Sequence, residues 1–334
     1  MKEDLRGVFL PITTPFHANE NLDLNGLRSN IQRWNASGIS GYVILGSTGE
    51  RVHLDEREYL EVVETARQEV APRPDGPVFM VGVGQESTRG TIAEIKRGTS
   101  LGADAVLVLT PHFYRAAITQ DVLHDHYVAV ADASSVPVIL YSMPALTGIK
   151  IEPKTVARLS QHENIVGIKD SSTDIAGFKE TIKLVSEPFA VLTGNGTVFY
   201  EALCAGVQGA VLAVGCVAPH LCLAIFNAVK TGEKERAGDL QERLTPLARA
   251  VTTLYGIAGL KAALDMIGYV GGTSRAPLVA PDEKARAIIA RILDDAHGFI
   301  TGSMTDLAAQ DRRVVSHGVS STAESSLAQE ATPS

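Results

Sequence analysis

Eight short apolar segments recur along the chain, each separated from the next by a longer segment with helical periodicity. Most of them are uniformly apolar rather than alternating, which is typical of strands in a parallel sheet covered on both faces. Eight strands alternating with helices, at about 30 residues per unit, predict a (β/α)8 barrel of about 250 residues. The segments are GVFLPITTP, GYVILGST, VFMVGVG, AVLVLTP, VPVILYSMP, IVGIKDSS, FAVLTGN and GAVLAVGCV.

The joints that lead into the apolar segments repeat as well. Gly38, Gly102 and Gly206 each stand two spacer residues before such a segment. A glycine at this place ends the preceding helix in a left-handed conformation, and the chain then turns into the sheet. The alternative architecture is a doubly wound open sheet, but no glycine-rich dinucleotide loop follows the first apolar segment. The pattern therefore favours the barrel.

The 334 residues divide into three predicted regions. Residues 1–220 form the barrel core with the active site, and residues 221–302 form the last barrel helix and a C-terminal helical extension. Within this second region, EKARAIIARILDDAHGFI has apolar residues at helical spacing and is predicted to be an amphipathic helix. Residues 303–334 are polar and rich in Ser, Ala and Thr, so we expect them to be disordered.

Composition limits the classes of partner. The net charge of −8 argues against nucleic acid as the main partner. The longest apolar runs are only strand-length, so no segment is predicted to span a membrane. Cys204, Cys216 and Cys222 show neither a metal-ligand spacing nor a disulfide framework, and MKEDLRGVFL contains no signal-peptide core. These features predict a cytoplasmic protein.

Polar residues follow several apolar segments, at the end of the barrel where catalytic groups lie. Tyr141 and Lys169 stand at the expected strand ends of two of the segments, and the turn GSTGE (46–50) follows the strand of a third. A buried lysine favours the neutral amine, which can attack the keto carbon of a 2-oxo acid and form an imine. A tyrosine can carry the proton, and the turn N–H groups with the Ser47 and Thr48 hydroxyls can hold a carboxylate.

Each of these features also has a plainer interpretation. Lys169 could be a solvated loop residue, Tyr141 a half-buried packing residue, and GSTGE an ordinary turn. Their joint placement at three strand ends favours the catalytic interpretation. His124 and His126 are two residues apart and point to different helix faces, so they are predicted to lie on a solvated helix rather than to bind metal. The imine mechanism needs neither a metal nor a cofactor, and none is predicted.

GSTGE, YSMPALTG (141–148) and GIKDSS (167–172) resemble the motifs of the dihydrodipicolinate synthase / N-acetylneuraminate lyase superfamily of class I pyruvate aldolases. The motifs stand in the order expected for that superfamily. The resemblance implies a (β/α)8 barrel with a C-terminal helical extension, commonly assembled as a homotetramer built as a dimer of dimers. It also implies a lyase whose small-molecule substrate is pyruvate or another 2-oxo acid.

The resemblance assigns roles by position. It makes Lys169 the Schiff-base lysine and Tyr141 the proton shuttle. Thr48 and its turn hold the substrate carboxylate, while Ser47 links the shuttle tyrosine to a second tyrosine in a proton relay. Val211 matches the position whose backbone lines the pyruvate site.

Two residues depart from the pattern of dihydrodipicolinate synthases. Leu146 stands where those enzymes carry an arginine that binds a carboxylate of the aldehyde substrate, and leucine cannot donate a hydrogen bond. Phe113 occupies the place of the second relay tyrosine, although Tyr114 is adjacent and a shift of one residue would let it serve. The two departures argue against a lysine-pathway synthase.

Segments outside the motifs most resemble 4-hydroxy-2-oxoglutarate aldolases, which split their substrate into pyruvate and glyoxylate. The longest such segment is YGIAGLKAALDMIGYVGGTSRAPL, and Ser171 matches a position proposed to contact substrate in that group. Three alternatives stay open. They are a 2-keto-3-deoxy sugar acid aldolase or dehydratase, a 4-hydroxy-tetrahydrodipicolinate synthase-like enzyme, and a non-catalytic relative that binds 2-oxo acids.

Overall fold

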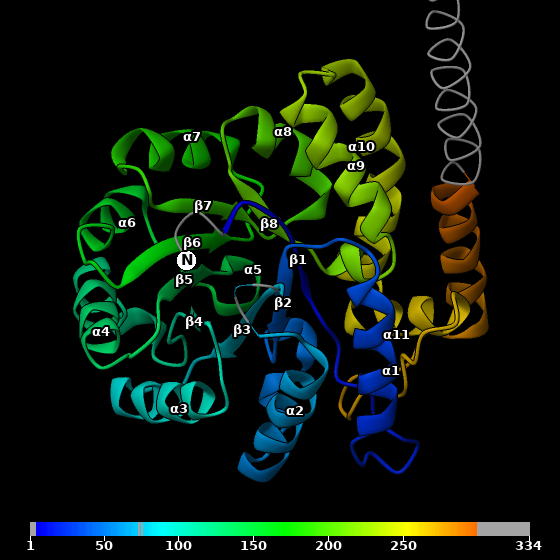
Figure 1. The fold of residues 1–334 in the computed structure, drawn as a ribbon, viewed down its shortest axis with the longest axis horizontal. Coiled ribbons are helices and arrows are strands. Elements are labelled where there is room, and N and C mark those ends of the chain that lie inside the picture. The colour runs from blue at the N-terminus through cyan, green and yellow to red at the C-terminus, as the bar shows by residue number, and fades with distance from the viewer. Residues whose placement is uncertain (1–4, 73, 75, 299–334) are drawn as a thin grey trace, which may run out of the picture.

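The chain folds into a closed barrel of eight parallel strands with helices around it (Figure 1). The computed structural model describes residues 5–72, 74 and 76–298. The strands pair in chain order, and the last closes the barrel against the first. They are β1 (Gly7–Pro11), β2 (Gly41–Ile44), β3 (Val78–Val83), β4 (Ala105–Leu109), β5 (Val138–Ser142), β6 (Ile165–Asp170), β7 (Ala190–Thr193) and β8 (Gly209–Val211). The predicted (β/α)8 fold is confirmed, with one strand in each apolar segment.

The strands are buried on both faces. On β5, Ile139 and Tyr141 belong to the apolar cluster inside the barrel, whereas Val138 and Leu140 pack outward into the cluster shared with the helices. Successive side chains of a strand point to opposite faces, so both faces of these strands must be apolar. This double burial explains why the strand segments are uniformly apolar in sequence.

Helices cover the outside of the barrel, and local signals fix their ends. At the start of the second helix, Asp55 and Glu58 form a capping box. Gly38, Gly102 and Gly206 have φ values of 78°, 87° and 104°, so the predicted left-handed glycines are confirmed. The helices are α1 (Leu24–Asn35), α2 (Glu56–Glu69), α3 (Thr88–Ser100), α4 (Gln120–Asp132), α5 (Pro144–Thr147), α6 (Pro153–Leu159), α7 (Ile175–Leu184), α8 (Phe199–Cys204) and α9 (Pro219–Lys230).

After α9 the chain adds helices on one side of the barrel (Figure 1). Helix α10 (Lys234–Arg249) leads through a short π-helical segment (Ala250–Leu254) into α11 (Gly256–Met266). A further helix covers residues 283–298, where the sequence predicts one. The tail predicted to be disordered, 303–334, lies outside the described residues.

The segment after α11 contacts α1 through hydrogen bonds and a stacked pair of aromatic rings. The buried Asn30 side chain donates to the Val270 carbonyl at 2.7 Å and accepts from the Val270 N–H at 2.8 Å. Trp34 stacks on Tyr269 with ring centroids 5.2 Å apart. The C-terminal extension is therefore held to the first β/α unit by specific contacts as well as by apolar packing.

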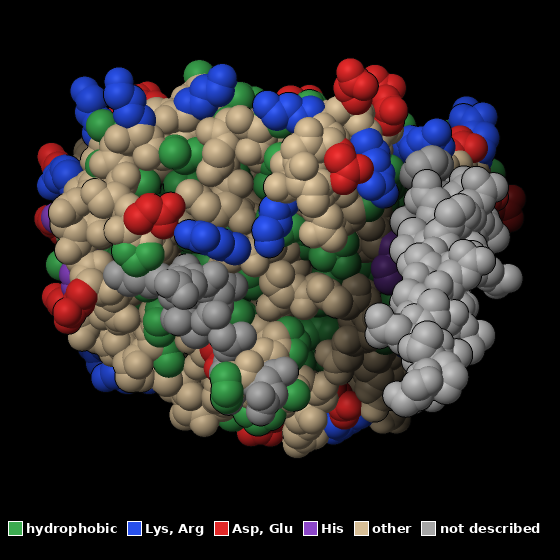
Figure 2. Space-filling view, turned by 45° about the horizontal axis from the view of Figure 1, so that its top comes forward, with side chains coloured by type: hydrophobic (Ala, Val, Ile, Leu, Met, Phe, Trp, Pro, Cys, Tyr) green, Lys and Arg blue, Asp and Glu red, His purple; other side chains and the backbone are tan. Residues whose placement is uncertain are grey.

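The surface carries charges of both signs. Figure 2 shows acidic and basic side chains interspersed across the face it presents. Within the described part of the chain, no helix combines the length and the apolar character that crossing a membrane requires.

The two histidines of α4 differ in environment. His124 is partly exposed, but His126 is only 6% exposed, and its Nδ1 lies 2.9 Å from Thr88 Oγ1. The prediction of a solvated helix is therefore wrong for His126, because this face of α4 packs against its neighbours. Burial lowers the pKa of His126 from 6.5 to about 4, so its ring is neutral in the folded protein at pH 7.

We expect the protein to lose stability as the pH falls below about 6.5, because the unfolded chain then binds a proton that the buried His126 does not accept. Between pH 7 and pH 5, this residue should lower the free energy of unfolding by about 2 kcal/mol. Urea denaturation of wild type and His126→Gln measures the effect, since glutamine does not titrate. An identical pH dependence in both proteins would contradict the assignment.

Candidate active site

Lys169 lies inside the barrel at the carboxyl end of β6. In the sheet it is directly beside Tyr141 of β5, whose ring belongs to the cluster inside the barrel. Lys169 is 4% exposed, and its Nζ lies 4.0 Å from the centroid of the Tyr141 ring. The structure thus brings together, in a site shielded from water, the two residues that the sequence predicts as nucleophile and proton shuttle.

The Tyr141 hydroxyl is surrounded by polar side chains. Its oxygen lies 3.0 Å from Ser47 Oγ, on the turn after β2. Burial acts to raise the pKa of Tyr141, but the nearby Lys169 charge lowers it. Hydrogen bonds with Ser47, Lys169 and Ser171 lower it further, so the pKa lies below the ordinary value for tyrosine. A phenol with a lowered pKa exchanges its proton more readily near neutral pH.

The GSTGE motif forms one turn of 3-10 helix at Ser47–Gly49. The N–H groups of Gly49 and Glu50 are bonded within the turn, and Thr14 Oγ1 donates to the Gly49 carbonyl at 2.7 Å. Among the residues that the structure describes, the N–H groups of Ser47 and Thr48 have no acceptor. The first N–H groups of a helical turn are those that can bind an anion. Of the N–H groups in the motif, those of Ser47 and Thr48 are therefore the candidates for binding the predicted carboxylate.

Ser171 and Gly194 complete the surroundings of the lysine. Ser171 is 9% exposed, and its N–H donates to the Ser142 carbonyl at 3.0 Å. Gly194 follows β7, and a Cβ there would collide with Ser171 Oγ and lie 2.7 Å from Lys169 Cε. Only glycine leaves room for both side chains. Sequence reasoning missed this role, because a glycine after a strand is first of all a turn residue; its placement at the catalytic end of a strand was the available signal.

Val211 is the last residue of β8 and pairs with Phe9 of β1 inside the barrel. Because all the strands are parallel, its backbone lies at the same barrel end as Lys169. We name five of the predicted residues the lysine cluster: Lys169, Tyr141, Ser47, Thr48 and Ser171.

The other predicted residues lie outside this cluster. Leu146 on α5 is 65% exposed, while Phe113 and Tyr114 are 73% and 70% exposed with their rings edge to face, 5.1 Å apart. Glu86 fixes this loop by accepting from the Phe113 N–H at 2.8 Å. In the described chain no contact joins Tyr114 to Tyr141, so its part in a proton relay stays a prediction.

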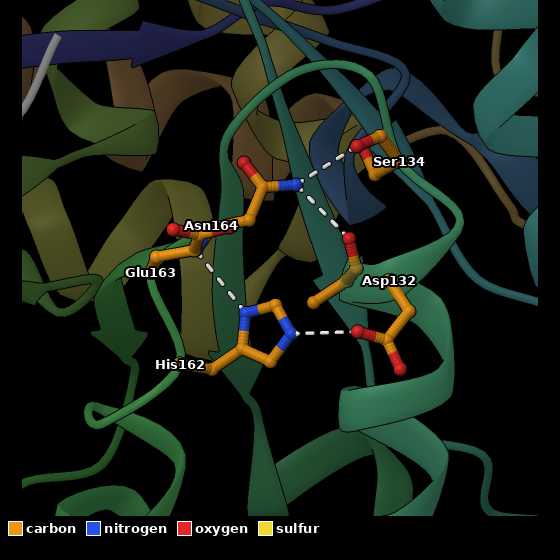
Figure 3. Close-up of a pocket in the computed structure, with 6 residues that line it drawn as sticks. Asp132, Ser134, His162, Glu163 and Asn164 are labelled. Carbon is orange, nitrogen blue, oxygen red and sulfur yellow. Dashed lines mark hydrogen bonds and ion pairs between the residues drawn. The ribbon is translucent and has the colours of Figure 1, made fainter.

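A cavity of about 400 Å³ lies at the opposite end of the barrel, before β5 and β6 (Figure 3). His162 Nε2 is 3.0 Å from Asp132 Oδ1, and His162 Nδ1 accepts from the Asn164 N–H at 3.1 Å. The Asn164 side chain donates to the Ser134 carbonyl at 2.9 Å. These polar groups join two loops, so we assign them a structural role.

The lysine cluster offers an amine, a phenol, hydroxyl groups and two N–H groups. Such a set suits addition to a carbonyl, proton transfer and binding of a carboxylate. As for metal ligands, the described residues contain no group of three or more His, Cys, Asp or Glu side chains arranged to hold an ion.

A closed (β/α)8 barrel with reactive side chains at the carboxyl ends of its strands is the architecture of a barrel enzyme. The model of the dihydrodipicolinate synthetase family matches residues 4–296, and the chain belongs to this family. It is a lyase of the class I aldolase type.

Among its relatives is the 4-hydroxy-tetrahydrodipicolinate synthase of Methanothrix thermoacetophila, 36% identical over 300 residues that cover 90% of this chain and 99% of the relative. The dihydrodipicolinate synthase of Thermotoga maritima has a crystal structure similar to this fold, with a TM-score of 0.82 and 31% identity over 87% of this chain and 98% of that one. The enzyme from Acinetobacter baumannii, solved in complex with pyruvate, gives a TM-score of 0.82 and 28% identity over 87% and 99%.

These findings confirm the predicted superfamily. They do not confirm the predicted closeness to 4-hydroxy-2-oxoglutarate aldolases, because the curated relative at 36% identity carries the name 4-hydroxy-tetrahydrodipicolinate synthase. The synthase-like alternative fits them better.

We expect Gly194→Ala to lower catalytic activity by about ten- to a hundredfold, because the added methyl group displaces the ends of Lys169 and Ser171. Stability should change little, since flexible side-chain ends rather than backbone must move. Steady-state kinetics and thermal unfolding measure the two effects. Gly238→Ala is the matched control, because a Cβ at this helix position meets nothing within 4 Å. Full activity in Gly194→Ala would contradict the predicted steric conflict of the added methyl group with Lys169 and Ser171.

Proposed function

We propose that the protein forms an imine between Lys169 and the keto carbon of pyruvate or another 2-oxo acid. The neutral amine adds to the carbonyl, and the resulting carbinolamine loses water to give a protonated imine. This imine withdraws electrons from the neighbouring carbon, so that a carbon–carbon bond can form or break there. The observation that carries the proposal is the burial of Lys169 with its amine against Tyr141.

Tyr141 is the proton shuttle in this scheme. It protonates the departing hydroxyl of the carbinolamine and takes the proton back when the imine is hydrolysed. Its lowered pKa and its contact with Ser47 Oγ support the role. Tyr114 would extend the relay only if its loop moved, since its ring is now exposed.

The carboxylate of the 2-oxo acid binds at the GSTGE turn. The N–H groups of Ser47 and Thr48, with their hydroxyls, supply the donors. Ser171 contacts the substrate beside the lysine, and the Val211 backbone lines the same site. The Acinetobacter baumannii relative solved with pyruvate supports pyruvate as the 2-oxo acid.

The first candidate for the whole reaction is the condensation of pyruvate with aspartate semialdehyde, as in a 4-hydroxy-tetrahydrodipicolinate synthase. Its support is the name of relatives such as the Methanothrix enzyme, which the chain matches over nine-tenths of its length. The second candidate is cleavage of 4-hydroxy-2-oxoglutarate to pyruvate and glyoxylate. Leu146 and Phe113 favour it, because they replace an arginine and a tyrosine expected in the synthases.

We further propose a cytoplasmic homotetramer that needs no cofactor. The exposed aromatic pair Phe113 and Tyr114 supports association, because large aromatic side chains are enriched where protein surfaces meet.

Borohydride reduction in the presence of pyruvate should attach the three-carbon unit to Lys169, because reduction converts the imine to a stable amine. Peptide mass spectrometry locates the adduct. Lys169→Ala should remove it, whereas Lys183→Ala, which changes an exposed lysine on α7, should leave it in place. No adduct at Lys169 under conditions that label a known aldolase would contradict the proposal.

Leu146→Arg should improve the half-saturation constant for aspartate semialdehyde about tenfold, because an arginine at this exposed position can pair with the aldehyde's carboxylate. The constant for pyruvate should not change. A panel with aspartate semialdehyde, 4-hydroxy-2-oxoglutarate and a 2-keto-3-deoxy sugar acid measures both proteins. Faster wild-type cleavage of 4-hydroxy-2-oxoglutarate than condensation would overturn the first candidate in favour of the second.

A further inference from the structure

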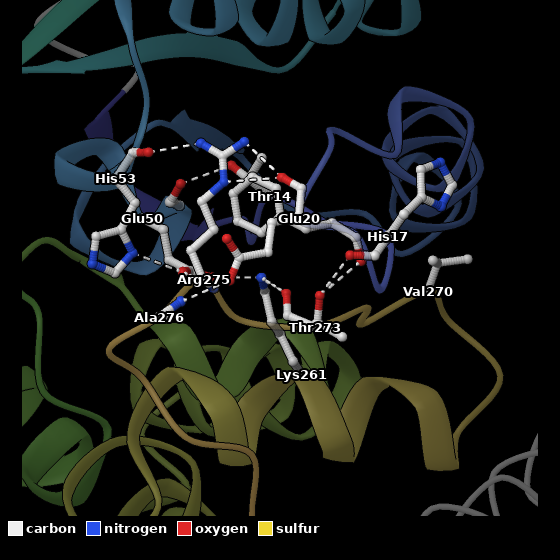
Figure 4. A network of polar contacts seen from close by, with 12 residues as sticks. Thr14, His17, Glu20, Glu50, His53, Lys261, Val270, Thr273, Arg275 and Ala276 are labelled. Atoms are coloured by element: carbon white, nitrogen blue, oxygen red, sulfur yellow. Dashed lines mark hydrogen bonds and ion pairs between the residues drawn. The ribbon is translucent and has the colours of Figure 1, made fainter.

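A buried cluster of charges joins the GSTGE turn to the C-terminal extension (Figure 4). Lys261 of α11 and Glu50, the last residue of the turn motif, have side chains that are each 1% exposed. Lys261 Nζ lies 2.5 Å from Glu50 Oε1. The ammonium also donates a hydrogen bond to the Thr273 carbonyl, at 2.7 Å.

The Glu50 carboxylate has two further partners. Its Oε2 accepts from the Arg275 N–H at 3.3 Å and lies 3.0 Å from His53 Nδ1. One carboxylate thus connects the loop after β2 with α11 and with the segment that follows α11.

Phe16 and Glu58 extend the same cluster. Lys261 Nζ and Arg275 Cζ lie 4.4 Å and 4.3 Å from the centroid of the Phe16 ring. The Arg275 guanidinium pairs with Glu58 in the first turn of α2. The cluster therefore holds five segments in one arrangement: the loops after β1 and β2, helices α2 and α11, and the segment after α11.

The backbone of Glu50 shows why such an arrangement is needed. Its φ is +55°, in the left-handed region that side-chain-bearing residues seldom adopt. Strained backbone of this kind persists only where the surroundings over-determine it. Glycine would relieve the strain at this position, but it has no side chain that could pair with Lys261. The side chain of Glu50 is therefore what anchors the end of the turn.

We propose that the Lys261–Glu50 ion pair is a positioning device that makes the C-terminal extension part of the carboxylate-binding site. The pair fixes the end of the turn whose first residues, Ser47 and Thr48, belong to the lysine cluster. This inference rests on the proposed function, since it assigns the turn to the 2-oxo acid carboxylate. Lys261 and Glu50 themselves touch no substrate in this scheme.

The extension offers a matched control. Asn30 holds the Val270 backbone, in the same segment after α11, through two hydrogen bonds, but it has no contact with the turn. Asn30→Ala should loosen the extension without releasing Glu50. General destabilisation would weaken pyruvate binding in Asn30→Ala as well as in a variant that lacks the ion pair. A positioning effect would weaken pyruvate binding only in the variant that lacks the ion pair.

The test uses the full chain with Lys261→Met, Asn30→Ala and the double variant Glu50→Gln/Lys261→Met. The double variant leaves no unpaired charge buried and so remains foldable if Lys261→Met is not. Thermal unfolding ranks stability, and the pyruvate concentration for half-maximal borohydride labelling of Lys169 reports binding. Hydrogen exchange of the backbone N–H groups of residues 46–50, measured without substrate, shows how firmly the turn is held.

We expect the ion-pair variants to need about tenfold more pyruvate, with faster exchange in the turn, and Asn30→Ala to match wild type in both. Wild-type binding and exchange in the folded double variant, or equal effects in Asn30→Ala, would overturn the inference. If wild type forms no adduct, the proposed function fails instead, and hydrogen exchange alone decides whether the pair holds the turn.

Discussion

The contact between the Lys169 amine and the Tyr141 ring is the feature on which the site depends, and much of the fold serves to produce it. The register between β5 and β6 sets the two residues side by side, and strand alternation turns the tyrosine into the barrel. Gly194 keeps the space that the lysine chain occupies. The same interior position shields the amine from water and brings the Tyr141 phenol within hydrogen-bonding distance of Ser47.

The sequence predicted most of the fold because the signals are local. A strand buried on both faces is apolar throughout, and a left-handed glycine ends three of the helices that turn back into the sheet, so both signals could be located one segment at a time. The location of the candidate site could be predicted from the predicted fold, since a parallel barrel brings together the residues at the carboxyl ends of its strands. Gly194, Glu50 and Lys261 were missed because their roles depend on neighbours distant in sequence. The burial of His126 was missed for the same reason, since periodicity does not show what a helix face packs against.

The lysine cluster and the mouth of the barrel determine different properties. The buried residues around Lys169 are the ones that we propose carry out the chemistry, in a chain whose residues 4–296 match the family model. Leu146 and Phe113 are exposed at the mouth, where an aldehyde would approach, and there the chain departs from the synthase pattern. One or two contacts in such a place change specificity without disturbing the imine. The buried charge cluster around Glu50 has a third role in our proposal, because it positions the turn that binds the carboxylate.

The central claim, that Lys169 is the nucleophile of a 2-oxo acid site, is tested most directly by a crystal structure of the protein soaked with pyruvate. We expect continuous electron density from Lys169 Nζ to the keto carbon, with the carboxylate against the N–H groups of Ser47 and Thr48. Unattached pyruvate beside a free Lys169, or attachment to a different lysine, would contradict it.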